Sequence, residues 1–432
     1  MRKRGFVVSA TAAVVTAVSL VGVQLSMPGW AGFRRDPKEV VDEVWQIVNR
    51  EYVDPSFNSV DWEAVRRDLL SREYATREEA YEAIREALKK LNDPYTRFLD
   101  PDQFASMQID TSGELTGVGI TLGVDQETNE LVVISPIEGS PADRAGIKSK
   151  DVIVRIDDKS TEGMDTNTAV SLIRGEPGTR VRLTIRREGE GLKVFDLVRE
   201  RIELATVRYE ARQEKNGLLI GYIRITQFSG NAADKVRQAI RELEKQGVAA
   251  YVLDLRANPG GLLYSSAEIA RMWIDRGSIV STVNRQGEQD RLVANNSALT
   301  DKPLAVLVDG GSASASEILS GALQDNRRAV IVGTQTFGKG LVQSVHPLSD
   351  GSGLAVTIAR YRTPKGTDID HKGITPDIVV ELSEEDLERL SKNRELVATA
   401  ADPQYAAAVR ALQSQIAARQ QPAPEVVRSS SR

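Results

Sequence analysis

The chain has 432 residues and a formal net charge of −5 at pH 7, a length that predicts two or three domains rather than one core. The slightly acidic balance argues against a nucleic-acid ligand, because phosphate neutralisation needs a clustered basic excess. The absence of cysteine excludes disulfides, thiol nucleophiles, iron–sulfur clusters and cysteine zinc sites. Only two histidines occur, His346 and His371, so a histidine-rich metal site is excluded and a Ser-His-Asp triad would have to use one of them. We expect no metal and no cofactor.

Residues 1–31 have the layout of a secretory signal. Three basic residues at 2–4 precede an uncharged stretch, 5–25, that is rich in Val and Ala, and charge returns at Arg34. The apolar stretch is also long enough to span a bilayer if it stays uncleaved. We therefore predict an exported protein of the periplasm or a lumen, with either a signal peptide or a membrane anchor.

Residues 36–110 are predicted to form a helical segment. Apolar residues repeat there at helical spacing: Val40, Val44, Ile47 and Val48, then Ala80, Ile84, Ala87, Leu88 and Leu91. Asp61 is a candidate N-cap for a helix over 62–70, and Thr76 with Glu79 matches a capping box before the next helix. Nothing in this segment suggests chemistry, so we interpret it as a packing or oligomerisation element.

Residues 113–200 change to a β-pattern with two short helices. The predicted strands are 131–134, 151–157 and 180–185, and the predicted helices are 140–147 and 166–174. This order, carried by the strings SPADRAGIKSKDVIVRID and AVSLIRGEPGTRVRLTI, resembles a PDZ domain. The resemblance implies a β-sandwich or partly open barrel with two helices.

A PDZ domain binds peptides by β-augmentation, in which the ligand adds a strand, here beside 118–122. The ligand's terminal carboxylate would be held by the backbone amides of Gly117, Val118 and Gly119. Ile120 and the helix around 169–173 would form an apolar pocket for its last side chain. Alone, the Gly-x-Gly-Ile string is explained equally well by a plain turn.

Residues 201–382 are predicted to form an α/β core with a largely parallel sheet, because buried strands alternate with helices. The predicted strands are 220–227, 250–254, 279–284, 304–308, 329–332, 342–346 and 354–361, and the predicted helices are 232–245, 265–273 and 315–323. Residues 383–432 are predicted to contain a helix around 405–418 and a disordered tail.

Two junctions in this core have small residues where a strand meets a helix. In LRANPGG (255–261), adjacent glycines let a backbone amide point into a cleft, as an oxyanion hole requires, although an ordinary turn also explains the string. In DGGSASASE (309–317), a serine at a helix start is exposed where amides stabilise an anion. Any of the three serines there could simply cap the helix, so composition does not choose among them.

A third junction places Lys339 between two glycines and near Phe337. In a low-dielectric site this lysine would bind its proton less tightly and could act as a general base, although an exposed loop lysine is the simpler interpretation. A P-loop is excluded, because the Gly-x4-Gly-Lys spacing is missing.

Together these junctions resemble the C-terminal processing peptidases, or tail-specific proteases. The matching strings are LRANPGG, DGGSASASEILSGALQDN and GTQTFGKGLVQSV, followed by YRTPKG and GITPDIVV, and the resemblance covers about 36–382. It implies a crotonase/ClpP-like core within a multidomain α+β fold. It also implies these roles: Ser314 as nucleophile, Lys339 as general base, Gln343 as support of the lysine, and Gly260 and Ala315 as oxyanion-hole amides. Arg174 resembles a family position that couples the PDZ domain to the protease, although an exposed salt-bridging arginine is the simpler interpretation.

The predicted function is that of an exported serine endopeptidase which binds protein C-termini through its PDZ domain and cleaves near them by a Ser-Lys mechanism. With two histidines and no cysteine, a hydrolase here needs another base, and lysine is a documented one. The expected partners are protein or peptide substrates with free, apolar C-termini, and the oligomeric state is left open. The alternatives are a non-catalytic PDZ scaffold, which has no need of Ser314, Lys339 and Gln343 together, and a crotonase-type acyl-CoA enzyme, which has no use for a PDZ domain.

Overall fold

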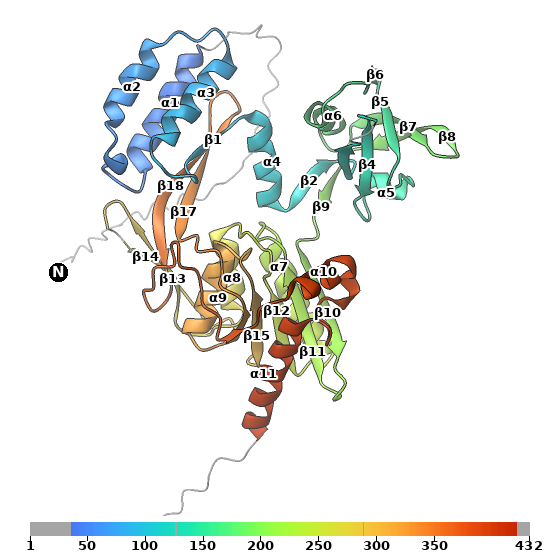
Figure 1. The fold of residues 1–432 in the computed structure, drawn as a ribbon, viewed down its shortest axis with the longest axis vertical. Helices are drawn as coiled ribbons and strands as arrows, with labels where there is room; N and C mark the ends of the chain where they lie inside the picture. Colours follow the sequence, from blue (N-terminus) through green and yellow to red (C-terminus); the bar gives the residue numbers. More distant parts are fainter. Residues whose placement is uncertain (1–35, 126–127, 288, 421–432) are drawn as a thin grey trace, which may run out of the picture.

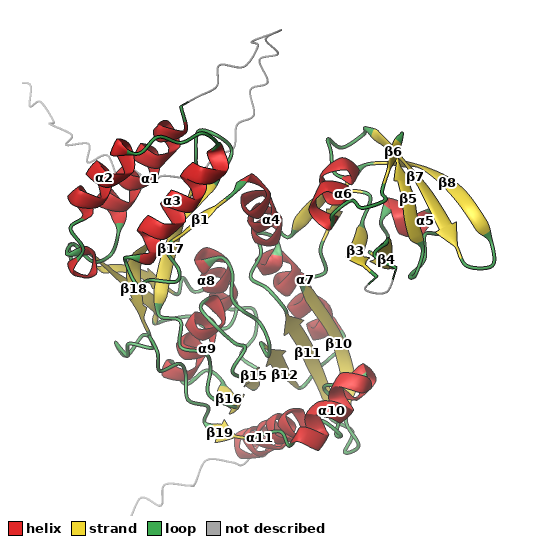
Figure 2. Cartoon of the chain, turned by 45° about the horizontal axis from the view of Figure 1, so that its top comes forward, coloured by secondary structure: helices red, strands yellow, loops and turns green. Residues whose placement is uncertain are grey.

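The computed structural model describes residues 36–125, 128–287 and 289–420 (Figure 1). The predicted targeting segment 1–31 and the predicted tail beyond 420 lie outside these residues. No helix in the described part of the chain is long and apolar enough to cross a membrane. Figures 1 and 2 show three parts: a helical segment, a small β-rich part that stands to one side, and a larger α/β part.

The helical segment packs on a β-ribbon of the α/β part. It contains α1 (Pro37–Glu51), η1 (Phe57–Ser59), α2 (Trp62–Ser71) and α3 (Arg77–Lys89). The predicted caps are confirmed: the Asp61 carboxylate accepts from the Ala64 N–H at 2.8 Å, and the Thr76 hydroxyl accepts from the Glu79 N–H at 3.2 Å. The apolar faces of these helices share one hydrophobic core with Leu354 and Val356 of that ribbon.

The chain after α3 does not remain helical. It forms β1 (Arg97–Leu99), which pairs antiparallel with β18 (Gly353–Arg362), and then α4 (Pro101–Ser112). The prediction of a purely helical packing element is therefore wrong in one respect, because three residues join a sheet of the α/β part. The reason is tertiary: a three-residue strand has no periodic pattern of its own and is stabilised by the partner strand.

The β-rich part has the predicted order of elements. Its sheet runs β3 (Ile120–Val124), β4 (Leu131–Pro136), β5 (Val152–Ile156), β7 (Arg180–Arg187) and β8 (Gly191–Val198), with β6 (Lys159–Ser160) beside β5. The helices are α5 (Pro141–Arg144) and α6 (Thr166–Ile173), and a ribbon of β2 (Glu114–Gly117) and β9 (Glu200–Glu203) leads in and out. Because β3 lies at one end of this sheet, no strand of the described residues pairs with its outer edge, and another strand could be added there.

The α/β part is built on a six-stranded sheet. Its strands, in spatial order, are β10 (Val207–Gln213), β11 (Leu219–Ile225), β12 (Ala250–Asp254), β15 (Leu304–Val308), β16 (Val330–Gly333) and β19 (Ile378–Val379). All neighbours are parallel except β10 and β11. One face is covered by α7 (Ala232–Lys245), α8 (Leu263–Arg271) and α9 (Ala315–Asp325), as Figure 2 shows.

Three of the predicted strands belong to a second, antiparallel sheet rather than to the parallel one. They are β13 (Ser278–Asn284), β17 (Leu341–Pro347) and β18, which assemble with β1 and β14 (Gln289–Val293). The short turn after β17 forces β17 and β18 into a hairpin, and hairpin strands are antiparallel. Strand patterns reveal which residues are extended but not which partners they choose, so this division was not predicted.

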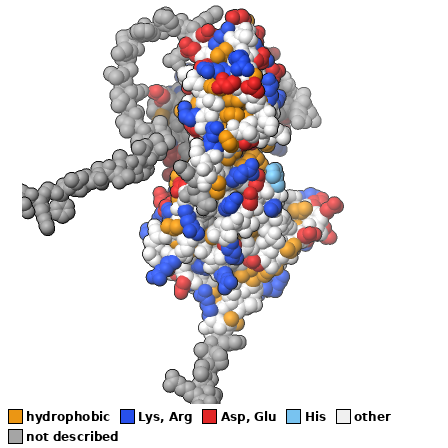
Figure 3. Space-filling view, turned by 90° about the vertical axis from the view of Figure 1, so that its left-hand side faces the viewer, with side chains coloured by type: hydrophobic (Ala, Val, Ile, Leu, Met, Phe, Trp, Pro, Cys, Tyr) orange, Lys and Arg blue, Asp and Glu red, His pale blue; other side chains and the backbone are white. Residues whose placement is uncertain are grey.

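The C-terminal part contains α10 (Glu384–Lys392), η2 (Arg394–Leu396) and α11 (Pro403–Gln420). The predicted helix around 405–418 is confirmed as α11, and it covers the second face of the parallel sheet through Tyr405, Ala408 and Leu412. On the face seen in Figure 3, basic, acidic and hydrophobic side chains are interspersed over the surface.

Candidate active site

Ser314 lies where β15 turns into α9. Its backbone has φ 55° and ψ −113°, so a non-glycine residue is held in the left-handed region immediately before the helix. Such backbone strain is tolerated where it positions a reactive side chain, as in the strand-to-helix turns of other hydrolases. The next residue, Ala315, begins α9, and its N–H has no hydrogen-bond partner among the described residues. A free amide at a helix start is a ready donor to an anion.

The other two serines of this turn are structural. Ser312 and Ser316 are both fully buried; the Ser312 hydroxyl donates to the Leu255 carbonyl at 2.8 Å and the Ser316 hydroxyl donates to the Asn258 carbonyl at 2.9 Å. These bonds fasten the serine turn to the LRANPGG loop. Ser314 is half-buried and open to solvent, which distinguishes it from its two neighbours.

Gly260, in the LRANPGG loop, packs directly on the serine turn. A Cβ on Gly260 would lie 2.9 Å from the Ser314 Cβ and 3.0 Å from the Ala315 nitrogen, so a side chain there would displace the serine. The Gly260 N–H, expected to serve the oxyanion hole, donates to Asn258 Oδ1 at 2.9 Å. The neighbouring N–H of Gly261 has no partner in the described part of the chain.

Lys339 lies between β16 and β17 and is half-buried. Burial lowers the pKa of its ammonium, assisted by the positive charge of Arg97 and opposed by Asp93 and Glu317. Its Nζ lies 4.5 Å from the centroid of the Tyr95 ring. No hydrogen bond joins Nζ to Ser314 Oγ in the described structure. Phe337 is exposed and does not provide this burial.

Glu317 is the residue that the sequence analysis missed. It is fully buried in α9, and its Oε2 accepts from the backbone N–H groups of Ser314 and Lys339, each at 2.9 Å. Its Oε1 accepts from the Thr336 hydroxyl at 2.6 Å and from the Gly338 N–H at 2.7 Å. One carboxylate therefore holds the serine turn and the lysine loop together. The Ser-x-x-Glu spacing of a capping box was the signal that could have revealed its bond to Ser314.

Tyr361 of β18 forms a second link between the two loops. Its hydroxyl donates to the Lys339 carbonyl and is a neighbour of the Ser314 side chain. Burial, together with the negative charge of Glu317, raises the pKa of Tyr361 well above its usual value. The hydroxyl therefore stays protonated and remains a donor at physiological pH.

Gln343, the predicted support of Lys339, points elsewhere in this arrangement. Its amide donates to Thr357 Oγ1 at 3.4 Å, and no bond to Lys339 is present among the described residues. The Thr357 N–H in turn donates to Thr96 Oγ1 at 3.0 Å. Gln343 is thus linked by hydrogen bonds, through Thr357, to Thr96, the residue after Tyr95.

A buried charge network lies behind the LRANPGG loop. Arg256 forms ion pairs with Asp254 at 2.7 Å and with Asp402, just before α11, at 2.9 Å. Burial opposes the charge of Arg256, but the two carboxylates raise the pKa of its guanidinium. Tyr222 donates to Asp254 at 2.7 Å. The network ties the C-terminal helix to the strand that precedes the glycine loop.

The predicted peptide-binding residues extend from the last residue of β2, Gly117, to the first residue of β3, Ile120. The N–H groups of Val118 and Gly119 have no partner among the described residues, as a carboxylate cradle requires. Gly119 has φ 76°, and a Cβ on it would lie 2.3 Å from the Ser140 Cβ, so only glycine fits there. Ile120 is half-buried against the core of this part.

Arg174 follows α6 and lies beside this cradle. Its Cα is 4.0 Å from the position that a Cβ on Gly117 would occupy. Arg174 is half-buried, and among the described residues its guanidinium has no acidic partner within ion-pair distance, so the interpretation as a salt-bridging surface residue finds no support there. An unpaired cation next to two free amides is suited to an anionic ligand.

The two histidines lie outside the site. His346 Nε2 is 2.8 Å from Glu51 Oε2 at the end of α1, and the His371 side chain is 89% exposed. Among the described residues no group of three His, Asp or Glu side chains is arranged to hold a metal ion.

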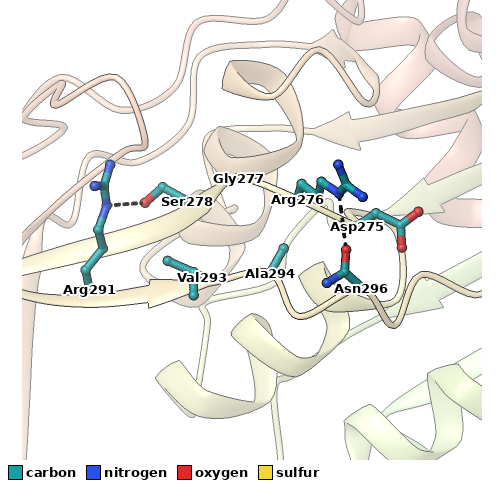
Figure 4. Close-up of a pocket in the computed structure, with 8 residues that line it drawn as sticks. All are labelled: Asp275, Arg276, Gly277, Ser278, Arg291, Val293, Ala294 and Asn296. Atoms are coloured by element: carbon teal, nitrogen blue, oxygen red, sulfur yellow. Dashed lines mark hydrogen bonds between the residues drawn. The ribbon is translucent and has the colours of Figure 1, made fainter.

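A surface pocket of about 550 Å³ lies apart from all of these residues, between the end of α8 and β13–β14 (Figure 4). Within it the Arg276 Nε donates to Asn296 Oδ1 at 3.3 Å and the Arg291 Nε donates to Ser278 Oγ at 3.0 Å. None of the predicted site residues lines this pocket, so its size does not mark it as the active site.

Comparison with protein families places two known modules in the chain. Residues 219–380 match peptidase family S41, and residues 132–187 match the PDZ domain. Both matches agree with the resemblances drawn from the sequence.

Comparison with individual proteins extends the match to most of the chain. A carboxyl-terminal-processing protease of Synechocystis sp. is 46% identical over 355 residues, which cover 82% of this chain and 83% of that protein. The chloroplastic carboxyl-terminal-processing peptidase 2 of Arabidopsis thaliana is 43% identical over 375 residues, covering 84% of this chain and 72% of that one. A solved structure of a photosystem II D1 C-terminal processing protease superposes with a TM-score of 0.54 at 38% identity, covering 85% of this chain and 99% of the other.

Proposed function

Because this chain belongs to the carboxyl-terminal-processing proteases of peptidase family S41, and is therefore a serine-type endopeptidase with a PDZ domain, we propose that Ser314 is its nucleophile and Lys339 its general base. The observation that carries the proposal is the buried Glu317 carboxylate. One of its oxygens accepts hydrogen bonds from the backbone N–H groups of both Ser314 and Lys339. Ser314 is strained and accessible, and Lys339 has a lowered pKa. These are the properties that a nucleophile and a lysine base need.

In the proposed mechanism, neutral Lys339 takes the proton from Ser314 Oγ, which attacks the scissile carbonyl and forms a bond to its carbon. The Lys339 ammonium then protonates the leaving amine as the peptide bond breaks, and an acyl-enzyme remains on Ser314. Water then attacks the acyl carbon while Lys339 accepts its proton; the bond from Ser314 Oγ to that carbon breaks, Lys339 returns the proton to Oγ, and the new C-terminus is released. For the first step Nζ must leave the Tyr95 ring and turn toward Ser314 Oγ, because no hydrogen bond joins the two atoms in the described structure.

The oxyanion of each tetrahedral intermediate would be held by backbone amides. The free N–H of Ala315 at the start of α9 supports its assignment as one donor. Gly260 can serve as the second donor only if its bond to Asn258 opens, whereas the Gly261 N–H is already free. Asn258 holds the loop in place by donating from its amide to the Ile225 carbonyl at 2.9 Å.

The substrates we propose are exported or membrane proteins with free, apolar C-termini. The substrate C-terminus would pair with the open edge of β3, with its carboxylate at Val118, Gly119 and Arg174, and a bond upstream would enter the Ser314 cleft. Export is supported by the signal-like segment 1–31. The similarity to a photosystem II D1 C-terminal processing protease makes a C-terminally extended membrane protein a suitable first substrate to examine.

The test is cleavage of an unstructured protein with a free C-terminus by the wild-type chain, Ser314→Ala and Lys339→Ala. We expect both variants to fold, by circular dichroism, and to lose activity at least about a thousandfold, as when a triad member is removed. Substantial turnover by either folded variant would contradict the assignment. A cleavage pattern unrelated to the C-terminus would leave the Ser-Lys pair in place and contradict the proposed recognition.

A further inference from the structure

Tyr95 comes from the part of the chain that the sequence predicted to be without chemistry. It lies between α3 and β1, and its neighbours fix its position. The Asp93 carboxylate accepts from the Tyr95 N–H at 2.9 Å and from the Thr96 hydroxyl at 2.7 Å. Thr96 Oγ1 then accepts from the Thr357 N–H at 3.0 Å, and β1 pairs with β18 directly afterwards. These bonds fix the backbone of Tyr95 against β18, the strand that also carries Tyr361.

The Tyr95 ring is what faces the Lys339 ammonium. Nζ lies 4.5 Å from the ring centroid, within the range of a cation–π contact. In the described part of the chain Nζ has no hydrogen-bond partner and no carboxylate within ion-pair distance. The charged groups around it lie farther off: Arg97 and Asp93 beside Tyr95, and Glu317 from α9. The Asp370 carboxylate also acts electrostatically on Tyr95 and on Tyr361 of β18.

We propose that Tyr95 is a further residue of the active site, whose ring holds the protonated side chain of Lys339 between turnovers and releases it when the amine is neutral. The proposal rests on the assigned role of Lys339. The face of an aromatic ring attracts an ammonium ion but gives a neutral amine no comparable attraction. The ring therefore stabilises the resting position only while Lys339 carries its extra proton. In this way Tyr95 helps to set the pH at which the base becomes available to Ser314.

The first test compares the pH dependence of kcat/KM for Tyr95→Leu, Tyr95→Phe and the wild-type chain. Leucine keeps an apolar cover over Lys339 but has no π face, whereas phenylalanine keeps the ring. We expect Tyr95→Leu to move the midpoint of the alkaline rise by about 0.5 to 1 pH unit toward lower pH, and Tyr95→Phe to leave it in place. A rate that falls equally at all pH values in Tyr95→Leu, with an unmoved midpoint, would show that Tyr95 only packs and would overturn the proposal.

A matched control is Tyr74→Leu. Tyr74 is a partly buried tyrosine of the same helical segment whose hydroxyl donates to the Leu69 carbonyl and whose ring does not contact Lys339. This variant should keep the wild-type midpoint. If Tyr95→Leu does not fold, Tyr95→Met replaces it, because methionine is apolar and flexible enough to adapt to the space and has no ring. A midpoint shift of equal size in Tyr74→Leu would also overturn the proposal.

A second measurement separates this proposal from the proposed mechanism. The titration of Lys339 is followed directly, by pH-dependent acylation and mass spectrometry, in chains that carry Ser314→Ala and therefore do not digest themselves. We expect Tyr95→Leu to lower the midpoint of Lys339 titration in that background. An unchanged titration, together with loss of activity in Lys339→Ala, would refute the role of Tyr95 and leave the Ser-Lys mechanism intact. A shifted titration together with an active Lys339→Ala chain would show that the ring stabilises the ammonium, but it would refute Lys339 as the base and with it the active-site role of Tyr95.

Discussion

One oxygen of Glu317 accepts hydrogen bonds from the backbone of both Ser314 and Lys339, each at 2.9 Å. The two residues come from separate loops, after β15 and after β16, and the buried carboxylate fixes the distance between them. Both oxygens of Glu317 are used, since the other accepts from Thr336 and Gly338. A site built in this way should respond sharply to the number of acceptors at position 317.

Glu317→Gln should therefore lower kcat/KM strongly. The amide keeps one acceptor oxygen but turns an NH₂ group toward two of the four donors that the carboxylate now accepts from. Each lost bond to a charged group is worth about 1.5–3 kcal/mol, so a fall of roughly tenfold to a hundredfold is expected together with a lower Tm. Steady-state kinetics and thermal unfolding of the same preparation check both effects. Glu188→Gln, in the exposed turn between β7 and β8, is the control and should change neither.

His346→Ala and His371→Ala should each keep wild-type kcat/KM. His371 is exposed, and His346 pairs with Glu51, so neither has a part in the proposed proton transfer. A loss of turnover in either variant with an unchanged Tm would bring back a histidine base. A small loss of stability in His346→Ala is compatible with the expectation, because its pair with Glu51 joins α1 to β17.

Proteolysis by the wild-type chain should increase from neutral to alkaline pH. Burial lowers the pKa of Lys339 from its ordinary value, so the neutral amine becomes populated at a lower pH than for an exposed lysine. Activity appears as the pH rises through this lowered pKa, because only the neutral form accepts the Ser314 proton. The measurement is kcat/KM between pH 6 and about 10, with circular dichroism at each pH to confirm that the chain is folded. A rate that falls from pH 7 to about 9 in folded protein would contradict this.

Asp402→Ala should destabilise the chain through Arg256. Both side chains are buried, and removal of one partner of a buried ion pair costs about 3–5 kcal/mol. Since Arg256 retains Asp254, we expect the lower part of that range in urea unfolding, accompanied by reduced activity because the LRANPGG loop is attached to the same strand. Glu388→Ala breaks the exposed pair with Lys392 and should cost less than about 1 kcal/mol. Equal losses in the free energy of unfolding for the two substitutions would show that the buried network stabilises the chain no more than an exposed ion pair does.

A peptide substrate with an amidated C-terminus should be cleaved at roughly a tenth of the kcat/KM of the free acid, or less. Amidation removes the carboxylate that the free amides of Val118 and Gly119 and the guanidinium of Arg174 would bind, a charge-assisted interaction worth about 1.5–3 kcal/mol. Arg174→Gln should reduce the difference between the two peptides. Equal kcat/KM for free and amidated peptides would assign specificity to the protease cleft alone.

The sequence by itself determined the elements and the identity of the chemical groups. Caps such as Asp61 and Thr76, the glycine at position 119, and the serine turn before α9 act over three or four residues, so local patterns reveal them. The strings around Ser314 and Lys339 were sufficient to suggest the family, which the comparisons then established. The domain boundaries and the roles of the individual site residues remain predictions.

Only the tertiary structure decided which residues meet. Thr96 and Thr357 are 261 positions apart and share a hydrogen bond. This bond holds the neighbouring Tyr95 where its ring lies against the Lys339 ammonium. Pairing of β1 with β18, the second sheet, the bond from Gln343 to Thr357 and the pair of Arg256 with Asp402 are likewise long-range. No local pattern encodes such contacts, because packing of the whole chain selects each partner. For that reason a segment without any chemical motif supplies the aromatic ring that lies against the proposed catalytic base.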